Sequence, residues 1–185
     1  MSFMKHSNLE GLHAMFSPSQ PSWLNYDDET AIEACTNRKA ASMGTRLHAW
    51  AKETIDLGIK QSNSKKTLCA YVNDAIGFKM STEVVLYYSD RFFGTADAIS
   101  FRNGLLRIHD LKTGKIPAKM KQLEIYAALF CLEYRVKPGE IDMELRIYQN
   151  DTVMVHIPTA DDILPIMDRI VHLDKLLTKY ESEEV

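Results

Sequence analysis

The sequence has 185 residues, of which 45% are hydrophobic and 25% charged, and its formal net charge at pH 7 is −3. This length fits one domain with a real hydrophobic core, and the composition is ordinary for a globular protein. The slightly acidic charge excludes a global attraction for nucleic acid, so any surface that binds nucleic acid would have to be a local basic patch.

Cysteine usage and hydropathy indicate the compartment. Cys35, Cys69 and Cys131 are far apart and include no C-x-x-C pair, which favours reduced thiols over a disulfide framework or a zinc site. Residues 1–16 lack the apolar core of a signal peptide, and no apolar run approaches membrane-spanning length. We therefore expect a soluble, cytoplasmic protein with no membrane partner.

The N-terminal half is predicted to be helical after an irregular start. Residues 1–26 form an irregular segment, because Ser17–Trp23 is rich in turn-forming residues. Acidic residues at 27–29 then begin a helix that runs to about Lys60. A polar loop follows, and Leu68–Gly77 is predicted to be a short helix.

Later segments are rich in β-branched and aromatic residues, as in strands. The predicted strands are Thr82–Tyr88, Phe92–Arg102, Leu105–Leu111, Ile141–Gln149 and Thr152–Ile157. Turns at Asn103-Gly104 and Asn150-Asp151 join two pairs into hairpins. Apolar stripes predict one helix over Pro117–Tyr134, between the third and fourth strands, and another over Ala160–Tyr180.

This order of elements predicts an α/β (α+β) fold with a mixed central β-sheet flanked by helices. The helix between the third and fourth strands supplies the crossover that a parallel strand pair needs. We expect a single domain over residues 27–180, followed by an acidic tail at 181–185.

Two aspartates on neighbouring strands form the candidate site. Pairing around the Asn103-Gly104 turn sets Asp97 opposite Asp110, about 5 Å away, where the two carboxylates can share one divalent cation. Lys112 shares a strand face with Asp110, because side chains alternate along a strand. His109 must face the other way, so we interpret it as structural.

The motifs around these residues resemble a nuclease family. G-T-A-D at 94–97, I-H-D-L-K-T-G-K at 108–115 and Q-L-E-I-Y at 122–126 resemble PD-(D/E)XK nucleases, in the branch of the RecB nuclease domain and lambda-type phage exonucleases. That branch often has a histidine in a G-x-x-x-H context, which 44–48 matches. The resemblance implies a restriction-endonuclease-like core.

The resemblance also implies roles for individual residues. The ligands of a Mg²⁺ or Mn²⁺ ion would be His48, Asp97, Asp110 and the carbonyl group of Leu111. The remaining catalytic residues would be Lys112 as the catalytic lysine, Gln122 and Tyr126 as a supporting pair, and Glu83 as an acidic residue on the preceding strand. From spacing alone, an inward-facing histidine such as His48 is more often a hydrogen-bonded core residue.

Basic residues near the site are candidates for DNA binding. They are Arg46, Lys115, Lys119 and Lys121. Runs of this kind are usually solvated faces, but here they adjoin the expected metal, which favours contacts with phosphates.

The resemblance therefore implies a metal-dependent deoxyribonuclease, an exonuclease of the phage recombination and repair type that acts on linear, double-stranded ends. It could assemble as a homo-oligomer or work with a recombination or helicase partner in trans. Three misplaced cysteines argue against the iron–sulfur cluster of some relatives. Two alternatives stay open: a structure-specific endonuclease of the same fold, and a non-catalytic, nuclease-derived DNA-binding subunit.

Overall fold

The computed structural model describes residues 14, 16, 18, 21–62 and 64–183. These residues belong to two compact units, one that ends at Thr45 and one that begins at Arg46. Helix α1, Asp28–Asp56, begins in the first unit and ends in the second.

The first unit holds one short 3-10 helix and the beginning of α1. The 3-10 helix η2, Pro21–Asn25, lies within the segment predicted to be irregular, and most of the rest of that segment is outside the described residues. The Asp27 carboxylate accepts a hydrogen bond of 2.8 Å from the backbone N–H of Thr30. This is an N-terminal cap, which explains why α1 begins where the acidic residues predict.

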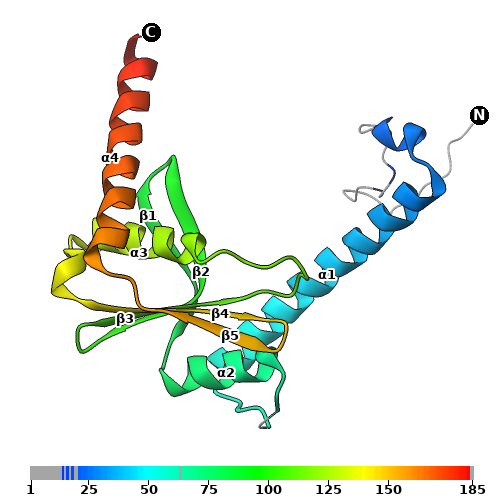
Figure 1. The fold of residues 1–185 in the computed structure, drawn as a ribbon, viewed down its shortest axis with the longest axis horizontal. Coiled ribbons are helices and arrows are strands. Elements are labelled where there is room, and N and C mark those ends of the chain that lie inside the picture. Colours follow the sequence, from blue (N-terminus) through cyan, green and yellow to red (C-terminus); the bar gives the residue numbers. More distant parts are fainter. Residues whose placement is uncertain (1–13, 15, 17, 19–20, 63, 184–185) are drawn as a thin grey trace, which may run out of the picture. The chain divides into compact units, whose positions relative to one another are not determined.

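The second unit is built around one five-stranded mixed sheet with the spatial order β1-β2-β3-β4-β5 (Figure 1). The strands are β1 Ser81–Ser89, β2 Phe92–Arg102, β3 Leu105–Leu111, β4 Asp142–Gln149 and β5 Thr152–His156. Strands β3 and β4 pair in parallel, and the other neighbours pair antiparallel. The predicted mixed sheet is confirmed.

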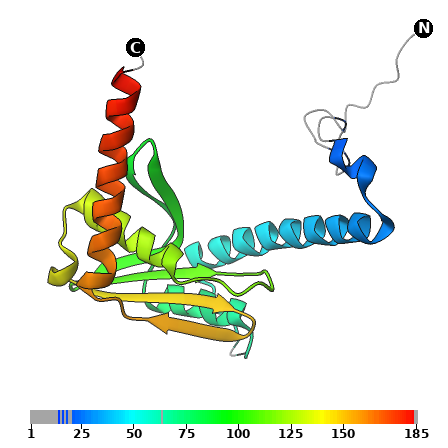
Figure 2. The ribbon, with the colours of Figure 1, turned by 45° about the horizontal axis from the view of Figure 1, so that its top comes forward.

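Helices cover both faces of the sheet. The helices of the second unit are α2 Thr67–Gly77, α3 Lys121–Tyr134 and α4 Ala160–Glu183. Helix α3, the crossover between β3 and β4, lies on one face, with α4 packed against it, and α2 lies on the other face (Figure 2). Each face has its own apolar core: one centred on α3 and one between α2 and the end of α1.

Ion pairs connect the tip of the β1–β2 hairpin to α4. Arg91, in the turn of the hairpin, forms a 3.2 Å ion pair with Asp174 and a second ion pair with Glu181. The hairpin, which carries part of the candidate site, is thereby held to the rest of the second unit.

Three helix ends differ from those predicted. Helix α1 ends at Asp56 rather than near Lys60, because the chain turns at Gly58, whose φ is +67°. Helix α3 begins at Lys121 rather than at Pro117, because the intervening chain is bound to the end of β4. Helix α4 continues to Glu183, into the predicted acidic tail.

Within the described residues, no helix is both long enough and apolar enough to cross a membrane.

Candidate metal centre

The β2–β3 hairpin brings Asp97 to Asp110 in the predicted register. Ala98 pairs with His109, and the next position outward along the ladder holds Asp97 on β2 and Asp110 on β3. The Asp97 carboxylate reaches across the strands and accepts a 3.0 Å hydrogen bond from the backbone N–H of Leu111. The carboxylate is thereby fixed at the end of the ladder.

Glu83 lies across from Asp97 on the other side of β2. The pairs Thr82–Ala98 and Val84–Ala96 flank this position, so Glu83 faces Asp97 in the register of β1 and β2. Its φ is +51°, in the left-handed region, and among the described residues it is the one non-glycine residue inside a strand with a positive φ. Such strain persists only where surrounding structure enforces it, and it is often found at functional sites.

The sheet reverses its pleat at this position. Residues two apart in a strand normally face the same side. Ala96, however, packs in the core under α3, whereas Ala98 packs in the core with α2. On β1, Val84 packs toward α3, whereas the Thr82 hydroxyl donates a 2.6 Å hydrogen bond to Asp56 of α1. Glu83 and Asp97 therefore lie at the position where the alternation of side chains reverses in both β1 and β2.

His48 completes a compact group of possible metal ligands. Its Nδ1 atom lies 3.4 Å from the Oδ2 atom of Asp97, and the side chain is about one-third exposed. One ligand atom from each of His48, Glu83 and Asp97 lies within 4.8 Å of the other two. The predicted ligands His48 and Asp97 thus meet, and Glu83 belongs to the same group. Asp110, also predicted as a ligand, is not in this group, and its Oδ2 atom lies 3.0 Å from the Lys112 ammonium.

Negative charge at this group is not fully compensated by the protein. Burial and then the charge of Asp110 raise the pKa of Asp97 to about 6, despite opposing contributions from the Leu111 N–H, His48 and Lys112. Carboxylate oxygens suit Mg²⁺ or Mn²⁺, and the single imidazole nitrogen favours a transition metal, which of these two is Mn²⁺. The residues therefore fit a divalent cation, which would relieve the repulsion between the carboxylates.

Tyr71 also belongs to this environment, although its sequence context did not single it out. It is buried on α2, and the pKa of its phenol is raised by burial and then by the charges of Asp97, Asp110 and Glu83. The phenol therefore stays a neutral hydroxyl near the carboxylates. Only the three-dimensional fold brings α2 to this position.

A chain of hydrogen bonds runs from Asp110 to α3. Asp110 is only 3% exposed, and the Lys112 ammonium donates to its Oδ1 atom at 3.1 Å. The same ammonium donates to the Oε1 atom of Gln122 at 2.9 Å, and the Gln122 amide donates to the Tyr126 hydroxyl at 3.4 Å. All four predicted residues are therefore connected, next to the group formed by His48, Glu83 and Asp97.

Gly94 leaves the space that the ring of Tyr126 occupies when its hydroxyl accepts the hydrogen bond from Gln122. A Cβ atom added to Gly94 would lie 2.9 Å from the Cε1 atom of the Tyr126 ring, closer than real contacts allow. The glycine at the start of G-T-A-D therefore makes room for the tyrosine at the end of Q-L-E-I-Y.

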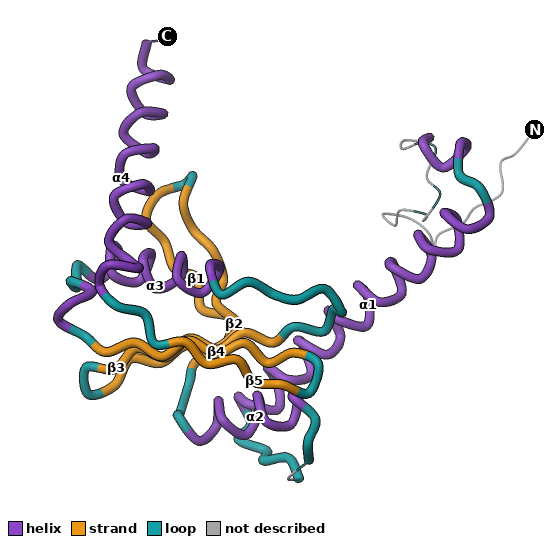
Figure 3. The backbone as a smooth tube through the Cα atoms, in the orientation of Figure 1, coloured by secondary structure: helices purple, strands orange, loops and turns teal. Residues whose placement is uncertain are grey.

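The predicted DNA-binding residues are not all placed alike. Lys115 and Lys119 are exposed on the loop of residues 112–120, which leads from β3 to α3 (Figure 3). Arg46 is exposed on α1, two positions before His48. Lys121 is also exposed, at the start of α3, and its ammonium lies 2.5 Å from a carboxylate oxygen of Glu124.

His109 faces the opposite side of the sheet from Asp110, as strand alternation predicts. It is fully buried, and its Nδ1 atom lies 3.2 Å from the hydroxyl of Tyr148. Burial, followed by the charges of Arg146 and Arg107, lowers its pKa to about 3, so the imidazole is neutral at physiological pH. His109 is therefore a structural residue.

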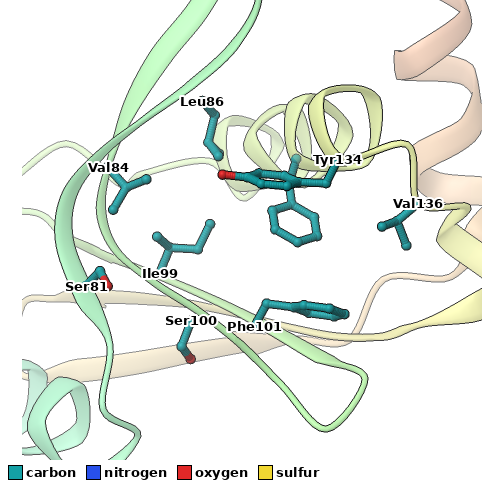
Figure 4. Close-up of a pocket in the computed structure, with 9 residues that line it drawn as sticks. Ser81, Val84, Leu86, Ile99, Ser100, Phe101, Tyr134 and Val136 are labelled. Carbon is teal, nitrogen blue, oxygen red and sulfur yellow. The ribbon is translucent and has the colours of Figure 1, made fainter.

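An apolar cavity beside the β1–β2 hairpin is separate from the carboxylates. A cavity of about 330 Å³ lies between the two strands and the end of α3, and Figure 4 shows the rings of Phe101 and Tyr134 at its edge. The lining includes Val84 and Ile99 but no acidic residue. This cavity has none of the chemistry of the candidate site.

No known protein-family model matches this sequence, and no curated protein is significantly similar to it. What the molecule does must therefore be inferred from the arrangement of its side chains.

Proposed function

We propose that the chain is a PD-(D/E)XK nuclease with a restriction-endonuclease-like core, and that it hydrolyses phosphodiester bonds of DNA with the help of Mg²⁺ or Mn²⁺. The more specific proposal is an exonuclease that acts on the ends of linear duplex DNA, in recombination or repair. Action on ends is proposed from the resemblance of the motifs to the branch that includes the lambda-type phage exonucleases.

One observation carries the proposal. Residues from four separate segments, α1, β1, the β2–β3 hairpin and α3, converge on one small region. Each of these residue types has a use in phosphodiester hydrolysis, and carboxylates with perturbed pKa values cluster at functional sites.

His48, Glu83, Asp97 and Asp110 would hold the cation. When bound at such a site, a divalent cation would lower the pKa of a coordinated water and stabilise negative charge on phosphate oxygens. The protein contributes the fixed positions of the ligands: Asp97 is oriented by the Leu111 N–H at 3.0 Å, and Glu83 is held by a strained backbone.

Lys112 would orient the attacking water and stabilise charge on the scissile phosphate. An ammonium has three N–H donors. Two are directed to Asp110 and Gln122 at 3.1 Å and 2.9 Å, so the direction of the third is set by these two contacts. A donor held in advance in this way stabilises the transition state without reorganisation.

The β3–α3 loop would contact the DNA backbone. Lys115 and Lys119 are exposed there, three and seven positions after Lys112 in the chain. Their charge offers a local attraction for phosphates in a protein whose net charge is −3.

The test is digestion of matched linear and covalently closed circular duplex DNA in Mg²⁺, Mn²⁺ or EDTA, with Asp110→Ala as the control. Metal-dependent loss of the linear form alone, abolished in Asp110→Ala, is the expected result. Cleavage of the circle would replace the exonuclease proposal by an endonuclease of the same fold. Absence of cleavage, with DNA still bound, would favour a non-catalytic DNA-binding subunit.

A further inference from the structure

A buried glutamine at the end of β4 holds the loop that follows the catalytic lysine. Gln149 is the last residue of β4 and is only 4% exposed. Its Oε1 atom accepts a 2.9 Å hydrogen bond from the backbone N–H of Ala118. Its Nε2 atom donates to the carbonyl oxygens of Gly114 and Ile116, each at 2.7 Å.

The preceding residue extends the same set of contacts. The carbonyl oxygen of Tyr148 accepts a 2.9 Å hydrogen bond from the backbone N–H of Lys112. The end of β4 therefore binds every second residue of the loop, at positions 112, 114, 116 and 118. Lys112 is held both through its backbone, by β4, and through its side chain, by Asp110 and Gln122.

Most of the loop receives little support from apolar packing, although Ala118 and Met120, near its end, pack against the core. Residues 113–117 are all exposed, and Ile116 is 86% exposed. The Gln149 amide, in contrast, is buried with one acceptor and two donor hydrogen bonds satisfied. Removing it would leave three backbone groups of the loop without this partner.

We propose that Gln149 is a positioning residue, which shapes the 112–120 loop so that Lys112, Lys115 and Lys119 are presented together to a DNA backbone. The inference that Gln149 fixes the conformation of the loop depends only on its hydrogen bonds. The role of the loop in DNA binding rests on the function proposed above.

The substitution Gln149→Met tests both parts, because methionine has similar length but cannot form these hydrogen bonds. Ile147→Val is the matched control, since it weakens the buried core two positions earlier on the same strand and leaves Gln149 and its hydrogen bonds in place. Amide hydrogen exchange, measured without DNA, should be at least about tenfold faster at Ala118 in Gln149→Met than in Ile147→Val. Unchanged exchange at Ala118 would overturn the proposed hold on the loop.

The second readout is cleavage of linear duplex DNA over a range of salt concentrations. We expect KM to rise in Gln149→Met, kcat to change less, and the slope of log affinity against log salt to become shallower by about 1 to 2, since two loop lysines lose their alignment. Faster exchange with unchanged KM and salt slope would overturn the DNA-positioning role. Should the wild-type protein cleave no DNA, the proposed function fails, while exchange at Ala118 still decides whether Gln149 holds the loop.

Discussion

The ammonium of Lys112 donates a 2.9 Å hydrogen bond to the side-chain oxygen of Gln122, which links the end of β3 to the first turn of α3. Gln122 in turn donates to the hydroxyl of Tyr126, at 3.4 Å. Helix α3 therefore contributes to the site by orienting Lys112, so we expect activity to be sensitive to substitution of Gln122.

Gln122→Ala should lower kcat by roughly 10- to 100-fold with little change in stability, because Lys112 keeps Asp110 but loses its second acceptor. Gln122→Glu retains an oxygen that can accept from Lys112, so its kcat should be closer to that of the wild type. Ile125→Ala, an exposed change on the same helix, is the control. Wild-type kcat in Gln122→Ala would show that the lysine does not need this contact.

Gly94→Ala should reduce cleavage several-fold while leaving the protein folded. The added Cβ would lie 2.9 Å from the ring of Tyr126, so the ring should shift and disturb the 3.4 Å hydrogen bond between its hydroxyl and Gln122. Gly77→Ala is a suitable comparison, since a Cβ there meets no atom within 4 Å. Both variants would be assayed for kcat and for thermal unfolding. Equal kcat in the two variants would contradict a role for the position of Tyr126.

Glu83→Asn should separate stability from activity. Asparagine adopts a positive φ more readily than glutamate, so relief of the strain at φ +51° should leave the free energy of unfolding unchanged or raise it by up to about 1 kcal/mol. Loss of the carboxylate should nevertheless abolish or strongly reduce metal-dependent cleavage. Chemical denaturation in EDTA and a cleavage assay measure the two effects. A variant that cleaves DNA as well as the wild type would remove Glu83 from the site.

The buried thiol of Cys131, on α3, should make the free energy of unfolding depend on pH in the alkaline range. Burial raises the pKa of its thiol from 9.0 to about 11. The thiol therefore stabilises the folded protein fully below about pH 9, and this contribution is lost as pH rises through about 11. Between these values the wild type should lose more unfolding free energy than Cys131→Ala, in which other titrating groups are unchanged. Parallel losses in both proteins would contradict the raised pKa.

The sequence predicts the part of the site that depends on short-range geometry. The Asn103-Gly104 turn has positive φ angles of 51° and 77°, as a tight hairpin requires, and it sets the pairing of β2 with β3. The meeting of Asp97 with Asp110 follows from that register. Strand alternation likewise places Lys112 beside Asp110.

The remainder depends on contacts between distant parts of the chain. The reversal of the pleat at Glu83 cannot be predicted from alternation, because alternation assumes an unbroken pleat. Tyr71 reaches the carboxylates only through the packing of α2 on the sheet. Gln149 binds residues more than 30 positions earlier in the chain, and for that reason α3 begins at Lys121 rather than at Pro117.

Calorimetric titration of the protein with Mn²⁺ shows directly whether these side chains form a site for a divalent cation. The wild type should bind Mn²⁺, and Asp97→Asn should lose that binding while retaining an acceptor for the Leu111 N–H. Asp168→Asn, which alters an exposed carboxylate on α4, should bind Mn²⁺ as the wild type does. Failure of the wild type to bind Mn²⁺, or equal binding by Asp97→Asn, would contradict the account.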